Sequence, residues 1–502
     1  MAQKALPYEY EIEESKSGLT AYGGLPPYLD LAYAAGLLKV IDRHLRIQGN
    51  QGWMDRQMIL SVVLLNLVGG DCVDDIEKLE ADEGICRVMR KVETHGLTRK
   101  EKKTVKQRWR KERTRTFPSA TAIFRYLAAF HTVEQEELRV KGKAFIPESN
   151  EHLKAFGKIN AELMKAGGQE DLATLDMDAT LAATLKKEAL FSYKGYQSYQ
   201  PLNTYWHERG LIVHTEFRDG NVPAGHDQLR VLQEALGYLP FWVKKVRLRS
   251  DTAGYQHELM RWCDCKDNKR FGEIEFAIGA DVTAEFRKAV SGVAEEDWQA
   301  LYREVNGQMQ ETGRQWAEVC FVPNKIGHSK NGPEYRYLAT REELKQGELP
   351  GMQKSDQEYL FPVMHMKGQR YKVFGIVTNM QWCGQELISW LHERCGKSEG
   401  AHSVMKTDFA GGQFPSGDFG ENAAWWWIMV LAHNLNAQMK RLVLGESWVN
   451  KRMKAIRFGL INIAARVMER SRGLWIRISE SHPSSGLIID MRRRIAQLAS
   501  SG

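Results

Sequence analysis

Aspartates stand where two strand-like patterns of the chain end. In the run Thr174–Thr180, Asp176 and Asp178 alternate with apolar residues, so a strand here would turn both carboxylates to one face and the apolar side chains to the core. A second alternating run, Val246–Ser250, leads to Asp251, and a helical pattern follows it. These patterns require a sheet with a helix after its second strand, and they place acidic side chains at the strand ends.

A third acidic segment has the pattern of a helix and spans residues 385–406. Its Glu399, His402 and Lys406 recur at i, i+3 and i+7 and fall on one side of a helix. A helix that packs across the sheet would bring Glu399 to the aspartates at the strand ends. Such a set of carboxylates suits two hard divalent cations such as Mg²⁺, which prefer oxygen ligands, and paired ions of this kind support phosphoryl transfer.

Each of these residues also has a plainer interpretation. An aspartate at a strand end commonly forms a turn or caps a helix N-terminus, and Asp251 taken alone is more typical of that role. Glu399, Lys406 and Arg394 taken alone are more typical of a solvated helix face. The metal-site hypothesis therefore depends on the three segments occurring together in one chain.

Four segments, in this order along the chain, resemble the bacterial DDE transposases of the IS1380 insertion-sequence family, which are relatives of the IS4 group. They are Thr174–Thr180, Phe217–Pro223, Arg249–Ala253 and Arg394–Lys406. The likeness extends along most of the chain and includes three further blocks, Leu65–Asp75, Phe117–Thr121 and Phe419–Asn422. Four matching segments in the right order are a much more specific signal than single aspartates.

The resemblance implies an RNase H-like core in which two aspartates and a glutamate bind two Mg²⁺ ions, with Mn²⁺ able to substitute. By position, Asp178 resembles the first acid of the family, Asp251 the second and Glu399 the third. Asp176 is expected on the same face of the strand and stays the alternative first ligand. The implied activity is DNA transposition: binding to terminal inverted repeats, cleavage of the DNA ends, and joining of the 3′ hydroxyls to target DNA. Two ends must be cut and joined together, so at least a homodimer on double-stranded DNA is expected.

The related IS4 group carries a Tyr-Arg-Glu-Lys signature around its last acid, with the lysine seven residues after the glutamate. Lys406 has this spacing from Glu399. Arg394 lies five residues before Glu399 rather than four, and Trp390 stands near the place of the tyrosine. The resemblance implies that Lys406, and with it Arg394, contacts DNA phosphates near the scissile bond.

A run of positive charge precedes the acidic segments. The net charge of the 502 residues is only +7, but residues 99–115 hold ten Lys or Arg against two Glu. Such runs are most often solvated surface, yet in a helical region they also suit the neutralisation of DNA phosphates, which gives affinity rather than sequence choice. A basic C-terminal stretch, 451–494, is a second candidate surface. The candidate DNA contacts in the first run are Lys102, Lys103, Lys106, Arg108, Arg110 and Lys111.

The predicted fold class is α/β: an RNase H-like mixed-sheet core, interrupted by a β-rich insertion and flanked by helical N- and C-terminal regions. The insertion follows from the 147 residues between Asp251 and Glu399, far more than a compact core needs. The expected divisions are a helical DNA-binding or dimerisation region at 1–165, the core at 166–281 and 385–440, the insertion at 282–384, and a basic helical region at 441–502.

Composition favours a soluble protein of a reducing compartment. Apolar content of 43% and charged content of 26% are typical of globular proteins, and seven cysteines without regular spacing argue against a disulfide framework. No leader and no run of about 20 apolar residues is evident, so a cytoplasmic location is expected. Cys263 and Cys265, with His257 nearby, are the one cluster that suggests zinc, but the second pair of ligands that such sites need is missing.

Three other functions remain compatible with the sequence. A structure-specific nuclease with the same core would cut DNA without joining it. A DNA-binding regulator descended from a transposase would have a silent site, and a zinc-dependent hydrolase would need the cysteines. Intact acids in all three segments count against the silent regulator, and strand joining at inverted repeats would distinguish a transposase from a nuclease.

Overall fold

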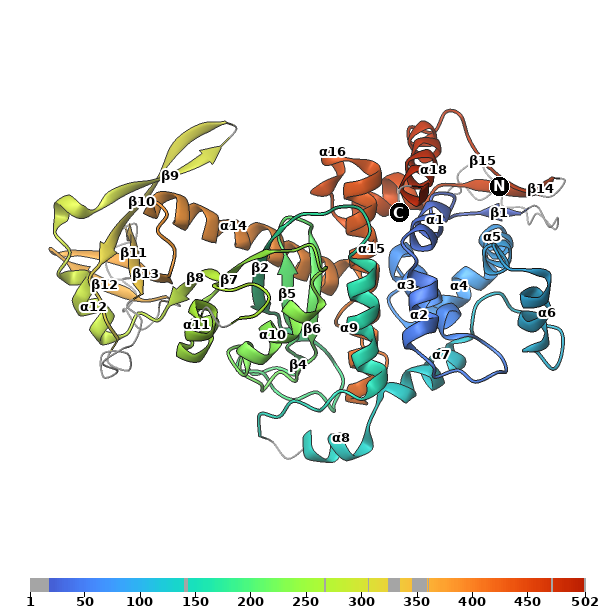
Figure 1. Ribbon diagram of the computed structural model, residues 1–502, viewed down its shortest axis with the longest axis horizontal. Coiled ribbons are helices and arrows are strands. Elements are labelled where there is room, and N and C mark those ends of the chain that lie inside the picture. Colours follow the sequence, from blue (N-terminus) through green and yellow to red (C-terminus); the bar gives the residue numbers. More distant parts are fainter. Residues whose placement is uncertain are drawn as a thin grey trace, which may run out of the picture.

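The computed structural model describes residues 18–139, 143–265, 268–305, 307–323, 335–344, 359, 361–470 and 473–500. A long sheet runs through the middle of the molecule (Figure 1). The helical part lies at one end of this sheet, and the strands of the insertion lie at the other. The candidate acids are in the central part, between these two ends.

The strands described in this sheet lie in the order β6-β5-β2-β7-β8-β13-β11-β10-β9, and β12 pairs with β13. β5 is antiparallel to both β2 and β6, whereas β2, β7 and β8 are parallel neighbours. An antiparallel meander of three strands beside two parallel strands is the arrangement of an RNase H-like core, which confirms the predicted fold class. The core strands are β2 (Leu172–Ala179), β5 (Leu202–Trp206), β6 (Leu211–Glu216), β7 (Lys245–Ser250) and β8 (Glu275–Ala280).

Alternation of side chains explains why β2 and β7 form where they do. Leu175 and Met177 are fully buried on one face of β2, and Leu248 on β7, which pairs with Leu175, continues this apolar layer. The sequence pattern does not mark β5, because all five of its residues are buried and no alternation is present.

Helices connect the parallel strands, as parallel pairing requires. α10 (Gln228–Tyr238) joins β6 to β7. The 3₁₀ turn η3 (Thr252–Gly254) and α11 (His257–Asp264) join β7 to β8. The helix after β7 confirms the helical pattern that follows Asp251 in the sequence.

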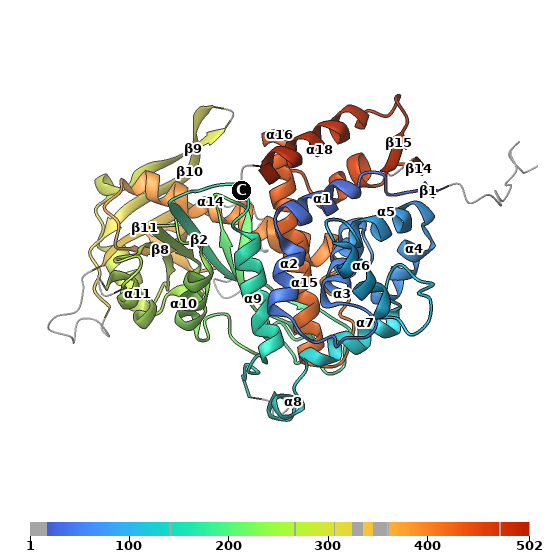
Figure 2. The same ribbon diagram turned by 45° about the vertical axis from the view of Figure 1, so that its right-hand side comes forward.

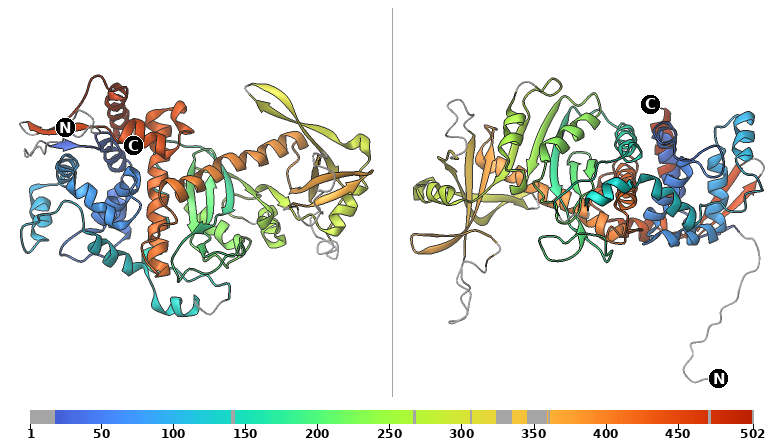
Figure 3. Two further views of the ribbon diagram at one scale, coloured as in Figure 1. Left: turned by 180° about the vertical axis from the view of Figure 1, so that it is seen from behind. Right: turned by 90° about the horizontal axis from the view of Figure 1, so that it is seen from below.

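The insertion continues the core sheet. β13 pairs antiparallel with the core strand β8, and β11, β10 and β9 follow outward. Figure 3 shows these strands at the end of the molecule, from behind and from below. The segment is β-rich, as predicted, and begins with α12 (Ala284–Ser291). Its strands are β9 (Gln299–Val305), β10 (Gln308–Val319), β11 (Arg336–Glu343), β12 (Val363–Met366) and β13 (Gln369–Thr378).

One long helix, α14 (Gly384–Ser403), leads from the insertion back across the core sheet (Figures 1 and 3). It contacts β9 and β10 of the insertion and β8 and β2 of the core. A π-helical turn, η6 (Val404–Asp408), follows it directly. Turns of this kind inside or after α-helices are frequent at functional sites.

Helices from both ends of the chain form one unit. The N-terminal helices are α1 (Pro26–Ala34), α2 (Leu37–His44), α3 (Asp55–Val68), α4 (Ile76–Ala81), α5 (Glu83–Glu93), α6 (Arg99–Gln107), α7 (Ala120–Leu127), α8 (Val133–Arg139) and α9 (Glu151–Leu163). The C-terminal helices are α15 (Phe419–Gln438), α16 (Glu446–Val449), α17 (Met453–Ile456) and α18 (Ser485–Ser500). α1 packs against α18 and α3 against α15, and their apolar side chains share one buried cluster (Figure 2).

A small sheet ties the two ends of the chain together. β1 (Leu19–Thr20) pairs with β14 (Ala465–Arg470), which in turn pairs with β15 (Gly473–Ile478). The C-terminal part of the chain therefore contains a β-hairpin in addition to the expected helices. None of the described helices combines the length and the apolar character needed to cross a bilayer.

The buried helix α15 is the centre of the helical unit. Trp425 and Trp426 have no exposed surface, Trp427 has very little, and the indole N–H of Trp426 donates a hydrogen bond to Thr215 of β6. These three tryptophans are therefore core residues.

Candidate active site

Asp178 and Asp251 lie side by side at the ends of the parallel strands β2 and β7. The register pairs Met177 with Ser250, so the next residues along the two strands, Asp178 and Asp251, are cross-strand neighbours. Because side chains alternate along a strand, both carboxylates point away from the apolar face that buries Met177. The fold therefore brings together two of the three expected acids.

Asp176, the alternative first ligand, is held in a buried ion pair with Arg249. Both side chains are fully buried. The guanidinium donates from Nε to Oδ1 of Asp176 at 2.6 Å and from Nη2 to Oδ2 at 2.9 Å. It also lies 2.6 Å from Nδ1 of His207 and donates to the backbone oxygen of Trp390 on α14. A carboxylate with both oxygens engaged in this way has less capacity left for a cation, so the geometry favours Asp178 as first ligand.

Buried residues of α14 face these carboxylates. Arg394, Ser398 and His402 follow one another at intervals of four residues, and all three are buried. Nη1 of Arg394 lies 3.2 Å from Oδ2 of Asp178. Nδ1 of His402 lies 3.8 Å from the same oxygen. The helix therefore places a guanidinium and an imidazole over the first candidate ligand, and Arg394 neutralises Asp178 within the protein.

The carboxyl group of Asp178 has a strongly perturbed pKa. Burial raises the pKa to about 6, and the positive charge of Arg394 opposes the shift. The negative charges of Asp251 and Glu399 raise the pKa of Asp178 further. Both of the other expected acids are thus within electrostatic reach of Asp178. A divalent cation among these carboxylates would relieve their repulsion.

Glu399 lies on an exposed flank of α14. It follows the buried Ser398, so its side chain points away from the face that packs on the sheet. Across the described residues, no three His, Cys, Asp or Glu side chains stand close enough together to hold one ion. Glu399 would therefore have to turn its exposed side chain toward Asp178 and Asp251 to complete a metal site.

Asp251 also has the plainer role that a strand-end aspartate often has. Its Oδ1 accepts a hydrogen bond from the backbone N–H of Ala253 at 3.0 Å and caps the turn η3. An ionised carboxylate has about four acceptor positions on its two oxygens. The cap fixes the orientation of Asp251 and leaves acceptor capacity for a ligand.

Lys406 lies on η6, the π-helical turn that follows α14. Burial lowers the pKa of Lys406, the negative charge of Asp178 opposes the shift, and the positive charge of Lys194 adds to it. These interactions place the ammonium group near the carboxylates, where a phosphate contact was expected from the sequence.

Two residues of this site were given no role from the sequence. Arg249 was noted only as part of a matching segment, because its buried pairing with Asp176 depends on the register of two strands that are far apart in the chain. Burial lowers the pKa of His402 to about 3, with Lys406 and Arg394 adding to the shift, so its imidazole is neutral at physiological pH. The helical spacing of His402 from Glu399 was the one available signal for it.

Comparison with known proteins shows a family match along most of the chain. A family model described as "Transposase DDE domain group 1" matches residues 19–500. The chain belongs to this family. No curated protein that was compared matches it. Among solved structures, it is similar to the piggyBac transposase in a synaptic complex with hairpin DNA, with a TM-score of 0.43 and 8% identity over 95% of this chain and 80% of that chain.

The basic run of this DDE transposase is largely solvent-exposed. Lys102, Lys103 and Lys106 are exposed on α6, a helix with no buried residue, and Arg110 and Lys111 are exposed just after it. A helix without an apolar face gains little from packing. Its side chains are available for a partner of opposite charge.

Arg108 differs from the other members of this run. Its guanidinium donates to the backbone oxygens of Gly49 at 2.7 Å, Gly52 at 3.0 Å and Trp53 at 3.0 Å. Trp109 packs edge-on against Trp53, with 5.1 Å between the ring centroids. The hydrogen bonds of Arg108 are therefore used within the fold, where they hold the loop before α3.

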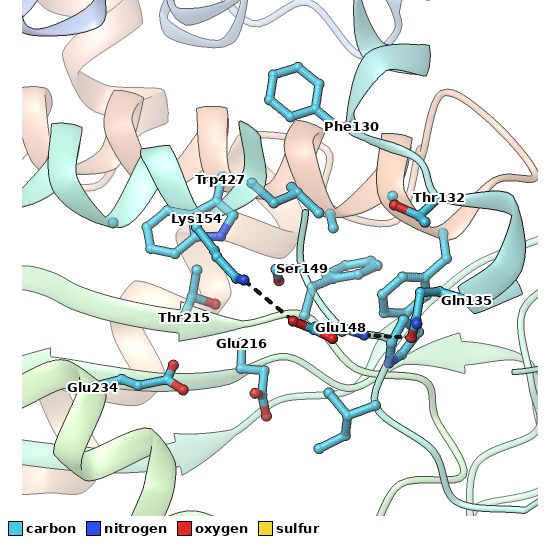
Figure 4. Close-up of a pocket in the computed structure, with 18 of the residues that line it drawn as sticks. Phe130, Thr132, Gln135, Glu148, Ser149, Lys154, Thr215, Glu216, Glu234 and Trp427 are labelled. Atoms are coloured by element: carbon cyan, nitrogen blue, oxygen red, sulfur yellow. Dashed lines mark hydrogen bonds and ion pairs between the residues drawn. The ribbon is translucent and has the colours of Figure 1, made fainter. Parts of the chain in front are cut away.

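A hollow of about 720 Å³ borders β6, the strand at one end of the described sheet order of the transposase. His214, Thr215 and Glu216 of β6 line it, whereas none of the three candidate acids does. Figure 4 shows Glu148 in this hollow with its side chain directed toward Lys154. Five acidic residues are among those that line it: Glu136, Glu148, Glu216, Asp227 and Glu234. Such a wall does not suit a DNA backbone, and the hollow is not part of the candidate site.

Proposed function

We propose that this transposase, of the IS1380 type, binds the terminal inverted repeats of its own insertion sequence, cleaves the DNA ends and joins the 3′ hydroxyls to target DNA. The observation that carries the proposal is the pairing of Asp178 with Asp251 at the ends of β2 and β7, on the face that α14 crosses with Arg394 and His402. Glu399 lies on α14, and Lys406 follows on η6 within electrostatic reach of Asp178.

The donor set fits hard divalent cations. Asp178, Asp251 and Glu399 offer only oxygen ligands, as Mg²⁺ prefers and Mn²⁺ accepts. Burial raises the pKa of Asp178, and the negative charges of Asp251 and Glu399 raise it further against the opposing charge of Arg394. We propose that these three residues hold two Mg²⁺ ions, with Mn²⁺ able to substitute. When bound, the ions would supply activation of the attacking oxygen and stabilisation of the leaving oxygen.

The remaining residues of the site would orient the ligands and the DNA. Arg249 fixes Asp176 and ties β7 to the backbone of α14, so it sets the distance between the strand acids and the helix. The neutral imidazole of His402 adds no charge beside Asp178. Lys406 would contact a DNA phosphate as a point charge, and the exposed lysines of α6 would add contacts along the backbone. We further propose that at least two copies of the chain act together on double-stranded DNA, because two ends have to be joined.

The test compares cleavage and strand joining on labelled DNA that carries the terminal repeats of the element. The variants are Asp178→Asn, Asp251→Asn and Glu399→Gln, with Asp176→Asn in parallel. Glu386→Gln is a matched control, because Glu386 is an exposed glutamate on the same helix, thirteen residues before Glu399.

We expect the first three variants to bind DNA and to lose Mg²⁺-dependent cutting by several orders of magnitude, and Glu386→Gln to stay active. Binding of the repeats by the unaltered protein without any cutting would instead identify a regulator with a silent site. Cutting without joining would identify a nuclease. Activity that survives Asp178→Asn but not a folded Asp176→Asn variant would reverse the assignment of the first acid.

A further inference from the structure

An exposed aromatic hairpin projects from the carboxylate end of β2. β3 (Ala182–Ala183), which begins four residues after Asp178, pairs with β4 (Ser198–Tyr199), and the residues between them form a loop. We call residues 182–199 the β3–β4 hairpin. Its tip is a tight turn in which the N–H of Gly195 donates to the oxygen of Ser192, with Gly195 in the left-handed conformation at φ +79°.

The hairpin exposes more aromatic surface than a solvated loop normally does. Phe191 is 64% exposed, Tyr193 is 78% exposed and Tyr196 is 38% exposed, all within six residues. Exposed apolar groups that cluster in this way usually mark a binding surface. They contrast with Trp425, Trp426 and Trp427, which are buried in α15.

The base of the hairpin is held rigidly. Arg139 and Asp219 form a fully buried ion pair, and Arg139 also donates to the backbone oxygen of Glu188 in the hairpin. Tyr199 at the end of β4 is buried against the rings of Phe217 and Phe414, at centroid distances of 4.7 and 4.8 Å. Aromatic rings on such an anchored base lose little further conformational freedom when they bind.

The hairpin is continuous with the candidate active site. Lys194 at its tip interacts electrostatically with Lys406 on η6, and Lys186 donates from Nζ to the backbone oxygen of Pro415 in the loop that follows η6. A side chain at Gly412 would clash with the oxygen of Ala183, since a Cβ there would lie 2.6 Å away. The hairpin thus packs beside the segment that carries Lys406.

Positive charge surrounds these rings. Lys187 and Lys194 are exposed on the hairpin, and Nζ of Lys194 lies 5.8 Å from the centre of the Tyr193 ring. Exposed aromatic rings interleaved with lysines are the combination that binds nucleic acid strands by stacking on bases and neutralising phosphates. A protein partner could pack on the exposed aromatic rings, but its binding would not require the lysines.

We propose that the β3–β4 hairpin stacks Tyr193, with Phe191 or Tyr196, on unpaired bases of the DNA strand next to the phosphate that is cut. This inference rests on the proposed function, since it assumes that DNA reaches Asp178 and Asp251. It adds a base-stacking element to a site otherwise built from carboxylates and cations. Each ring that stacks on a base should change DNA affinity by about tenfold.

The first test is photocrosslinking with 5-iododeoxyuridine, placed in turn at each position beside the cleavage point of terminal-repeat DNA, with Ca²⁺ in place of Mg²⁺. Iodouracil crosslinks efficiently to an aromatic ring stacked on it, and mass spectrometry identifies the attached residue. We expect crosslinks at Tyr193, Phe191 or Tyr196, at one or two positions next to the cut. Crosslinks found only elsewhere in the chain, or only deep within the duplex, would overturn the proposal.

The second test compares substitutions within and outside the hairpin. Tyr193→Ala should weaken binding of the end about tenfold, whereas Tyr193→Phe should retain it, because the ring and not the hydroxyl stacks. Leu185→Ala removes a 95% exposed aliphatic side chain of the same hairpin, and Phe241→Ala removes an 83% exposed ring before β7. Both control variants should bind as the unaltered protein does.

The outcomes separate this inference from the proposed function. If the unaltered protein cuts and joins the ends, but Tyr193→Ala binds them normally and no hairpin crosslink forms, only the stacking proposal falls. If Tyr193→Ala instead changes the mass measured by light scattering without DNA, the hairpin is an interface between copies of the chain, and the proposal is also wrong. If the unaltered protein neither cuts nor joins, the proposed function itself fails.

Discussion

Replacement of Arg249 by methionine should destabilise the core of the transposase strongly. Arg249 and Asp176 are both fully buried and share two hydrogen bonds of 2.6 and 2.9 Å. Without the guanidinium, the carboxylate of Asp176 is left buried and unpaired, which typically costs about 3–5 kcal/mol. The same change removes the hydrogen bond to the backbone of Trp390, so the contact between β7 and α14 is weakened as well.

A neighbouring arginine provides the matched control. Arg247 lies two residues earlier on β7 and pairs with Glu275 at 2.7 Å, but both side chains are partly exposed, at 19% and 26%. Arg247→Met should cost only about 1 kcal/mol, because water solvates the glutamate that is left behind. The contrast between the two variants isolates the effect of burial from the effect of losing an ion pair.

The assay is urea unfolding monitored by circular dichroism. It compares the unaltered protein with Arg249→Met, Asp176→Leu, the double variant of these two, and the control Arg247→Met. Arg249→Met and Asp176→Leu should each be strongly destabilised, whereas the double variant should regain most of the loss, because no unpaired buried charge remains. The reasoning is refuted if Arg249→Met costs no more than Arg247→Met, or if the effects of the two single changes simply add.

Three further predictions concern other parts of the transposase. Lys406→Ala should lower cleavage and reduce the salt dependence of DNA binding by about one released counterion. Lys406→Arg should keep that salt dependence. Fluorescence anisotropy at several salt concentrations measures the salt dependence of binding. Burial lowers the pKa of His433 to about 4, below its unfolded value of about 6.5. Its contribution to stability is therefore complete above pH 6.5 and is lost as the pH falls toward 4. Between pH 7 and pH 4.5 the free energy of unfolding of the unaltered protein should fall by about 2–3 kcal/mol more than that of His433→Gln, as measured by denaturant unfolding. Equal losses in the two proteins would contradict the lowered pKa of His433. Arg108→Ala should lower the melting temperature because it removes three hydrogen bonds to backbone oxygens, whereas Lys103→Ala should leave it unchanged and weaken DNA binding.

Local sequence patterns were sufficient for much of the core. The alternation in β2 and β7 predicted both strands and the shared face of Asp176 and Asp178, and the helix after β7 followed from the helical pattern after Asp251. β5 escaped prediction because its residues are buried on both faces and show no alternation. The pairing of β13 with β8, which makes the insertion an extension of the core sheet, depends on contacts between distant segments.

The site was predictable only as far as the strand ends. Alternation alone could not separate Asp176 from Asp178, because both lie on one face of β2; the distinction comes from Arg249, which belongs to a strand about 70 residues away. The basic run was visible, but its charge did not reveal that Arg108 bonds to the loop at Gly49 and Gly52. In both cases the deciding contact joins segments that are separate in the sequence.

The most direct test of the account is a count of the Mn²⁺ ions that the protein binds together with terminal-repeat DNA. Electron paramagnetic resonance gives this number for the unaltered chain and for four variants: Asp178→Asn, Asp251→Asn, Glu399→Gln and Asp176→Asn. The account predicts two ions on the unaltered chain and on a folded Asp176→Asn variant, and loss of at least one ion in each of the other three. Two ions retained by both Asp178→Asn and Asp251→Asn would contradict it, because the metal would then be held elsewhere.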